Sequence, residues 1–306
     1  MSTGAIDPGL AAAPAVATAA PPARLRQHQW LATLAIASRM GRTRIGLVIV
    51  GVMVLIALFG PLFAPHGPTV FVGIPNSGAS SHALFGTDAI GRDVFSRFLY
   101  GGRSVLGLAV AATLVGIVLG TIIGLAAAYS GGAVDETLMR ICDVFLAFPQ
   151  IVFALLLVSA FGPKLYLLVL TVGITHAPRV ARVMRGAALQ VVERDFVKAA
   201  EAVGESRSRI LFSELLPNVT SPLLVETGLR LTYSIGLVAA LSFLGFGLQP
   251  PHADWGLMIN ENRLALSVQP WGVVLPVMAI ALLTIGTNLV TDGIARAAIG
   301  LDRRET

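Results

Sequence analysis

The chain alternates long apolar runs with shorter segments that hold most of its charges. Six runs stand out: residues 45–64, 104–128 and 141–161, one that begins at Leu165 and fades into Arg179 and Arg182, and two at about 221–248 and 271–290. A helix needs about 20 apolar residues to cross the hydrocarbon core, and inside lipid it pairs its own backbone amides. No run alternates with the two-residue period of a membrane barrel strand. We therefore predict an all-α polytopic membrane protein with six transmembrane helices.

Composition supports a membrane protein and argues against a nucleic-acid partner. The 306 residues are 55% hydrophobic and 13% charged, against about 25% charged in a soluble domain, and the mean hydropathy is +0.78. The net charge is +5, but there are only two lysines, Lys164 and Lys198, and the arginines flank the apolar runs. That placement suits membrane topology better than phosphate binding. Contact with membrane lipid is therefore expected, and contact with nucleic acid is not.

The distribution of positive charges predicts how the six helices are oriented. If the N-terminus is cytoplasmic, the cytoplasmic segments hold 16 lysines and arginines and the outer segments hold 5, leaving out Arg230 within the fifth run. Lysine and arginine concentrate in the cytoplasmic loops of membrane proteins. We therefore expect the N- and C-termini both to be cytoplasmic.

The first thirty residues have two interpretations, a signal peptide or a disordered tail. Residues 9–20 are rich in Ala and Pro, and no Lys or Arg precedes Arg24, so the positively charged start of a signal peptide is missing. We prefer the tail. The expected division is a cytoplasmic N-terminal tail at 1–43, the first helix with an outer segment at 44–103, a core of five helices at 104–296, and a cytoplasmic C-terminal tail at 297–306.

The segment between the fourth and fifth runs, residues 186–220, is too long for a turn and too apolar for a solvated linker. Asp195 is expected to cap a short helix that Gly204 ends, and Ser206 to start a second helix that Pro217 ends. Such a pair of helices exposes a surface of apolar and small residues, which is typical of a site for a protein partner. A hairpin lying on the membrane surface explains the basic residues equally well, so both interpretations stay open.

Three glycines of the second run, Gly116, Gly120 and Gly124, recur every four residues and lie on one face of a helix. Small residues at this spacing let helix backbones approach closely in a membrane. We predict a helix-packing seam, within the bundle or with a partner subunit, although 32 glycines in the chain also permit a chance pattern.

Ionisable residues inside or beside the runs are few, and most have a structural interpretation. Glu226 and Arg230 are spaced to form an ion pair along one helix face, which we prefer to a transport relay. Asp143 is expected to meet water or Arg140. His176 is interpreted as a satisfied histidine at an interface rather than as a titrating group. Cys142, the only cysteine, is expected to be a buried structural thiol.

The chemistry of an enzyme is absent from the sequence. Neither lysine belongs to a phosphate-cradling Gly-Lys-Ser/Thr loop, the five histidines are scattered without ligand spacing, and no nucleophile elbow is present. We therefore expect no catalytic residue, no metal site and no enzyme activity. If the chain takes part in transport, the energy must come from another chain or from an ion gradient. The apolar pattern also permits two other classes, a secondary transporter driven by an ion gradient and a non-transport membrane scaffold.

The segment at 186–220 resembles the EAA loop of permease subunits in bacterial ATP-binding-cassette (ABC) importers. Ala199-Ala200, Gly204 and Leu216-Pro217 match its spacing. In that family the loop is a coupling helix that docks into a groove of the ATPase subunit. The resemblance implies a coupling interface made of Phe196, Ala199, Ala200, Glu201, Gly204, Ile210, Leu216 and Pro217.

Further blocks resemble the second, C-type permease of the dipeptide/oligopeptide/nickel branch, over about residues 45–304. They are Gly86-Thr87-Asp88, Gly91-Arg92-Asp93, Ser96-Arg97 and Tyr100-Gly101; Asp135-Glu136, Met139-Arg140, Asp143 and Ala147-Phe148-Pro149; Leu241-Ser242-Phe243-Leu244-Gly245, Gln249-Pro250-Pro251 and Trp255-Gly256; and Asp292-Gly293.

This resemblance implies a type I ABC importer transmembrane domain in a bacterial cytoplasmic (inner) membrane. The implied partners are a homologous permease in a heterodimer, two cytoplasmic ATP-binding subunits and an extracytoplasmic solute-binding protein. The chain itself would hold no cofactor, because ATP would be bound by the partner subunits. Peptide is the favoured substrate, with nickel, glutathione or another small solute as alternatives.

Overall fold

The computed structural model describes residues 29–305, so the predicted disordered tail before residue 29 lies outside the described residues. All named elements of the described chain are helical. Extended pairing within it is limited to isolated bridges, such as Phe71 with Arg92 and Thr87 with Asp93. The predicted all-α class is confirmed.

Five helices are long and apolar enough to cross a membrane. They correspond to five of the six predicted runs, and their bounds are α2 (Gly41–Phe59, continued by the short turn η2, Gly60–Leu62), α3 (Val94–Ser130), α6 (Leu165–Val192), α10 (Thr220–Phe243) and α12 (Trp271–Glu305).

The prediction of a single helix for the third span is corrected, because this span is not one straight helix. It consists of α4 (Gly132–Ala147) and α5 (Gln150–Phe161), which meet at an angle of 86°. Phe148 between them is extended, with φ −87° and ψ 135°. Pro149 explains the break, since proline disfavours the helical conformation for the residue before it and has no backbone N–H to donate. Counted as one bent span, the pair brings the candidate spans to six.

Three other boundaries differ from those expected. The helix α3 begins ten residues before the predicted run at 104–128, because the Asp93 carboxylate accepts a hydrogen bond from Ser96 N (3.0 Å) and caps it. The expected division at 103/104 therefore falls inside α3. Within the expected N-terminal tail, α1 (Gln29–Arg39) packs on α12 with Ala37 buried. The expected C-terminal tail continues α12 as helix to Glu305.

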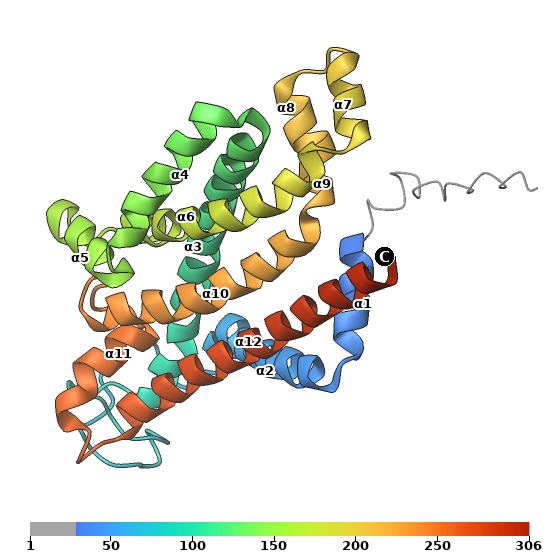
Figure 1. Cartoon of the computed structure of the whole chain (residues 1–306). Coiled ribbons are helices and arrows are strands. Elements are labelled where there is room, and N and C mark those ends of the chain that lie inside the picture. Colours follow the sequence, from blue (N-terminus) through green and yellow to red (C-terminus); the bar gives the residue numbers. More distant parts are fainter. Residues whose placement is uncertain (1–28, 306) are drawn as a thin grey trace, which may run out of the picture.

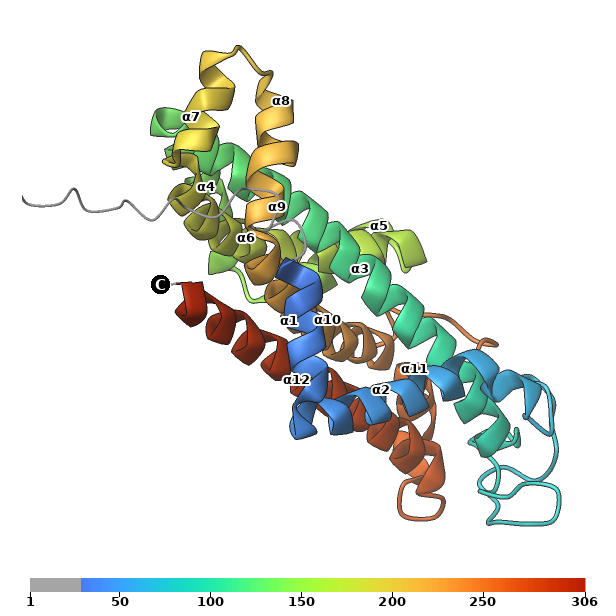
Figure 2. The same cartoon turned by 90° about the vertical axis from the view of Figure 1, so that its right-hand side faces the viewer.

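The two ends of the bundle carry different structures (Figures 1 and 2). At one end a helical hairpin projects from the bundle, and we call this the hairpin end. At the other end lie the irregular segment 63–93 and α11 (Trp255–Asn262), followed by η4 (Arg263–Ala265), and we call this the loop end. Helix α3 runs between the two ends and packs along α6.

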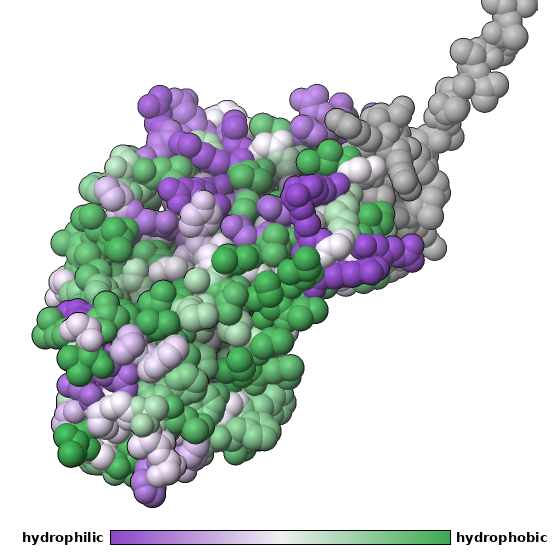
Figure 3. Space-filling view, turned by 90° about the horizontal axis from the view of Figure 1, so that it is seen from below, coloured by the Kyte–Doolittle hydropathy of each residue, from purple (hydrophilic) through white to green (hydrophobic). Residues whose placement is uncertain are grey.

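The surface between the ends is largely apolar. Exposed side chains on the long helices include Val48, Leu55, Leu114, Val118, Met278 and Ile285. In Figure 3 apolar residues cover a broad area of the face in view, while hydrophilic residues gather in separate patches, mainly toward the top. Exposed apolar side chains of this extent are what a helix facing lipid or another membrane subunit presents.

Candidate functional site

The hairpin consists of residues 195–218 and has two arms. The first arm is α7 (Asp195–Ala202), and the second contains α8 (Arg207–Arg209), the π turn η3 (Ile210–Leu215) and α9 (Leu216–Asn218). Gly204 ends α7 with φ +80°, a conformation that glycine adopts without strain. Two bonds close the turn, Gly204 N to Glu201 O (3.0 Å) and Glu205 N to Ala200 O (3.1 Å), the pattern of a Schellman cap.

Two of the four expected boundaries of the hairpin are confirmed and two are corrected. Gly204 ends the first helix as predicted, and Ser206 caps the second by accepting a hydrogen bond from Arg209 N (3.4 Å). Asp195 is not the cap: it lies in the first turn after Arg194, where its charge suits the positive end of the helix. Pro217 does not end the second helix, because it lies at the start of α9, where its missing N–H is tolerated.

The residues predicted to form the coupling interface differ in how far they face solvent. Ala199, Glu201 and Gly204 are exposed, whereas Ile210 is fully buried and supports the hairpin from inside. The half-buried members of the predicted set are Phe196, Ala200, Leu216 and Pro217.

Sequence reasoning missed two apolar residues that the hairpin exposes. Val203 is 78% exposed beside the turn, and Phe212 is 52% exposed on the second arm. The signal in the sequence was an apolar residue next to the helix-ending glycine and another on the outer side of the second arm. With Ala199 and Ala202, which are also exposed, they make an apolar and small-residue surface at the free end of the molecule.

The inside of the hairpin is continuous with the packing of the bundle. Val197, Ile210 and Leu215 are fully buried and belong to one cluster with Leu125 of α3 and Met184 of α6. A side chain in a close-packed cluster cannot shift without displacing its neighbours. The hairpin and the helix pair α3–α6 are therefore mechanically connected.

The glycine face of α3 lies against α6. A Cβ at Gly116 would come within 2.7 Å of His176 Cβ, and a Cβ at Gly124 within 2.8 Å of Met184 Cβ. At Gly120 it would collide with Val180 and lie 2.6 Å from Ala177 O. All three positions have no room for a side chain, so the glycines set the distance between the two helices.

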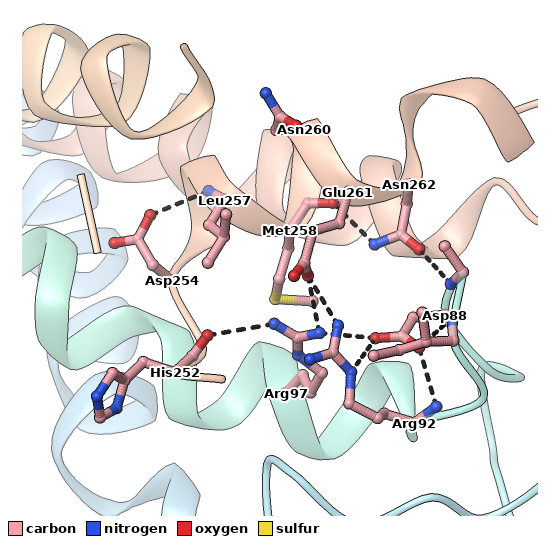
Figure 4. A network of polar contacts seen from close by, with 12 residues as sticks. Asp88, Arg92, Arg97, His252, Asp254, Leu257, Met258, Asn260, Glu261 and Asn262 are labelled. Atoms are coloured by element: carbon pink, nitrogen blue, oxygen red, sulfur yellow. Dashed lines mark hydrogen bonds and ion pairs between the residues drawn. The ribbon is translucent and has the colours of Figure 1, made fainter. Parts of the chain in front are cut away.

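At the loop end, four charged side chains form a buried network (Figure 4). Asp88 Oδ2 accepts from Arg92 Nε and from Arg97 Nη1, both at 2.7 Å. Glu261 Oε2 of α11 lies 2.9 Å from Arg92 Nη2 and 2.8 Å from Arg97 Nη1. Arg97 Nη2 also donates to the His252 carbonyl (3.3 Å). The network ties the irregular segment and the start of α3 to α11.

The same contact region brings together two of the sequence blocks that carried the resemblance. Trp255 is fully buried, and its indole N–H donates to Phe98 O (2.9 Å). Its ring lies against Gly101 and Gly102, where a Cβ would come within 2.9 Å and 2.7 Å of ring atoms. Asp254 caps α11 by accepting from Leu257 N (3.1 Å). These motif residues therefore hold the loop end together.

Two carboxylates of the loop end have raised pKa values. Burial raises the pKa of Glu261 to about 7, with Arg92 opposing the rise and Asp88 adding to it. Burial also raises the pKa of Asp254, although hydrogen bonds from Ser104 and from Leu257 N oppose it.

Inside the bundle, the predicted ion pair is present and His176 has partners. Arg230 Nε lies 2.8 Å from Glu226 Oε1, and both side chains are buried. His176 is fully buried, with Nδ1 2.9 Å from Gln150 Nε2 and Nε2 3.0 Å from Ser234 Oγ. The prediction of a satisfied histidine is confirmed, although the histidine lies in the bundle interior and not at an interface.

Two further single-residue predictions have mixed outcomes. Cys142 is buried, as expected. Asp143 pairs with Arg182 of α6 and not with Arg140, which corrects one of its two expected partners, while its exposed carboxylate also faces solvent as the other alternative had it. Arg140 pairs instead with Glu136, one turn earlier on α4 (2.6 Å).

A bundle of long apolar helices with an exposed hairpin anchored in its core is the architecture of an integral membrane protein. The chain belongs to the family of binding-protein-dependent transport system inner membrane components, whose model matches residues 116–299. A second model, the N-terminal transmembrane domain of oligopeptide transport permease C, matches residues 43–78. The chain is thus a permease subunit of an ABC importer and not an enzyme, which decides against the secondary transporter and the non-transport scaffold.

Relatives and a solved structure agree with this assignment. The chain is 36% identical to a dipeptide transport system permease protein DppC of Alkalihalophilus pseudofirmus, over 83% of this chain and 84% of the relative. It is 39% identical to a glutathione transport system permease protein GsiD of Pectobacterium atrosepticum, over 72% and 74%. Its fold resembles that of the MetNI methionine ABC transporter in inward-facing conformations, with a TM-score of 0.51 at 18% identity, over 69% of this chain and 96% of that chain.

Proposed function

We propose that this permease subunit forms half of a pathway that imports peptides or a related small solute, driven by ATP that separate subunits bind and hydrolyse. The relatives are named for dipeptide, glutathione and peptide transport. Glutathione is itself a tripeptide, so all three names describe one chemical class. This shared chemistry supports a peptide as the solute.

The proposed assembly contains a homologous permease in a heterodimer, two cytoplasmic ATP-binding subunits and an extracytoplasmic solute-binding protein. The family description, which names dependence on a binding protein, supports the last of these. ATP would be bound by the partner subunits, and no cofactor is assigned to this chain.

The proposed orientation places the hairpin and both termini in the cytoplasm. The basic residues Arg207 and Arg209 of the hairpin and Arg39 at the end of α1 support it, since positive residues concentrate on the cytoplasmic side. The loop end, with its network around Asp88, would then face the binding protein.

The hairpin is proposed to be the contact through which the ATPase acts on the permease. One observation supports this proposal most directly. The hairpin shares its buried core with α3 and α6, and it exposes an apolar and small-residue surface that includes Ala199 and Val203. Closure of the ATPase pair would move the hairpin, and the close packing would pass the movement to both helices. Access to the pathway would then alternate between the two sides of the membrane.

Substitution of Ala199 by Trp tests this contact. The side chain is exposed in the chain alone, so Ala199→Trp is expected to leave the fold and membrane insertion intact. It is expected to abolish ATP-driven uptake in proteoliposomes and to lower co-purification of the ATPase, because a bulky side chain would prevent close docking. Gly204 is a poorer position for the test, since its φ of +80° would strain any side chain.

The matched control is Ala79→Trp, which places the same side chain at an exposed alanine of the loop end. The control subunit should still co-purify with the ATPase. If Ala199→Trp retains both ATPase binding and uptake at the wild-type level, the hairpin is not the docking site.

A further inference from the structure

Arginines recur at every third residue along α6, on the side that faces α4 and α5. Arg185 is paired with both carboxylate oxygens of Asp135, and Arg182 with Asp143. Both acids lie on α4, and the two pairs follow each other along the antiparallel contact of the helices. Each guanidinium at this contact is therefore neutralised by a carboxylate.

Arg179, one step further along α6, breaks the pattern. The segment opposite Arg179 is the start of α5, just beyond the break that follows α4. There a neutral amide takes the place of a third acid, and Arg179 Nη1 donates to Gln150 Oε1 at 3.3 Å. Among the residues that the structure describes, no carboxylate lies within ion-pair distance of Arg179. Its positive charge therefore has no counter-ion among the described side chains of residues 29–305.

The count of positive charges placed Arg179 in the cytoplasmic segment after the fourth run, whereas α6 continues as one helix through Arg179 to Val192 and is long and apolar enough to span a membrane. Arg179 is the fifteenth of the 28 residues of α6, roughly 21 Å from the start of the helix at about 1.5 Å per residue. Its side chain is exposed on the surface of the bundle. An ionised residue within a membrane-spanning helix normally faces a partner or a water-filled cavity, which makes Arg179 a candidate for a substrate route.

A second guanidinium lies near the first. Arg230 is buried, and although Glu226 is its ion-pair partner, its Nη1 group has no hydrogen-bond partner in the described chain. Arg179 lies close enough to act electrostatically on both Arg230 and His176. In the part of the chain that the structure describes, Glu226 pairs with Arg230 alone, so Arg179, Arg230 and Glu226 together carry one uncompensated positive charge.

The surroundings of Arg179 suit a ligand that has both an anionic and an apolar part. Gln150 is held in place by Thr175 Oγ1 (3.0 Å) and by His176 (2.9 Å), so it presents its oxygen to Arg179 and cannot supply a charge. A small recess at the break between α4 and α5, with room for about one water-sized group in this conformation, is lined by Arg179 and Gln150 together with the aromatic rings of Phe145, Phe148 and Phe153.

We propose that Arg179 binds the carboxylate of the solute as it crosses the membrane, with Arg230 as a second source of positive charge. A guanidinium binds a carboxylate through two parallel hydrogen bonds, and every linear peptide with a free C-terminus carries one. This inference rests on the proposed function, since it assigns a recognition group to the same pathway.

The test uses the complete transporter in proteoliposomes, with Ala-Ala and its C-terminal amide as probes. Both are supplied at concentrations that saturate the binding protein, whose affinity for each is measured separately. The measured quantity is the initial uptake rate of Ala-Ala divided by that of its C-terminal amide. Arg179→Gln is expected to lower the ratio about tenfold, as expected for the loss of a charge-assisted hydrogen bond. Arg179→Lys should retain most of the wild-type ratio.

Gln150→Glu is a second variant that leaves Arg179 in place. It would supply the missing carboxylate and should lower the ratio as much as Arg179→Gln does. Arg182→Gln is the matched control, an arginine one turn away whose partner is Asp143, and its ratio should stay within about twofold of wild type.

An unchanged ratio in Arg179→Gln overturns the inference while the proposed function stands. Equal loss of both probes, or an equal effect of Arg182→Gln, also overturns it, because Arg179 would then pair with a partner subunit or act structurally. A wild-type complex that imports neither probe counts against the proposed substrate class itself.

Discussion

Among single residues outside the membrane-spanning helices, Glu261 couples the stability of the fold to pH. Its carboxylate lies within 3 Å of two arginines, yet burial raises its pKa to about 7 from an ordinary value of 4.5. The folded protein therefore binds this proton more tightly than the unfolded chain does. By linkage, the contribution of Glu261 to stability is fully present below pH 4.5 and is lost as the pH rises through about 7.

The variant Glu261→Gln tests this sign. The difference between the pKa of Glu261 in the folded protein and its ordinary value corresponds to about 3 kcal/mol of stability. The Tm of the wild type should therefore fall more between pH 5 and pH 8 than the Tm of Glu261→Gln, whose side chain cannot ionise. Thermal unfolding of the purified protein at several pH values measures the difference. Glu136→Gln, at an exposed acid of α4, serves as the control. If the Tm changes equally with pH in the wild type and in Glu261→Gln, the raised pKa of Glu261 is refuted.

Residue contacts could be predicted from the sequence only where the partners are close along the chain. The pair Glu226–Arg230 follows from a spacing of four on one helix. Asp143 was expected to meet water or its near neighbour Arg140, but its partner Arg182 is 39 residues away. The pairs across the loop end, such as Arg92 with Glu261, are separated by 169 residues, and no local spacing indicates them.

At the scale of elements, the contact of α3 with α6 depends on glycine, and Gly120→Ala tests it. The added methyl group would lie 2.6 Å from Ala177 O and collide with Val180. Overpacking of this kind typically costs about 1–3 kcal/mol, so Gly120→Ala should lower the Tm by several degrees. Gly107→Ala is the matched control on the same helix, with nothing within 4 Å of the new atom, and alanine favours helix there. Equal Tm values for the two variants would contradict the seam.

The helices could be predicted from the sequence wherever one apolar run corresponds to one helix. Leu165 begins α6 and Trp271 begins α12, as the runs indicate. The bend at Phe148-Pro149 was missed because the run stays apolar across the proline, so hydropathy alone gives one span. The early start of α3 was missed because the Asp93 cap precedes ten residues that include charges.

At the scale of the whole molecule, the hairpin end and the loop end are held by separate sets of contacts. Val197 and Ile210 anchor the hairpin in the packing of α3 and α6, while Trp255 and Arg97 hold the loop end to the start of α3. Because α3 reaches both ends, the movement that we propose for the hairpin would be transmitted along one continuous helix. The sequence indicated the hairpin through its glycine and small residues, but its anchoring depends on contacts between distant segments and could not be predicted.

The most direct measurement of the central claim is crosslinking between the hairpin and an ATPase. Cys142 is the only native cysteine and it is buried, so Ala199→Cys and Val203→Cys each introduce one accessible thiol. In membranes that contain the complete transporter, we predict that both variants crosslink to the nucleotide-hydrolysing subunit, and that Ala79→Cys at the loop end does not. The account is contradicted if neither hairpin cysteine reaches the ATPase, or if both are labelled by reagents confined to the outer side of the membrane.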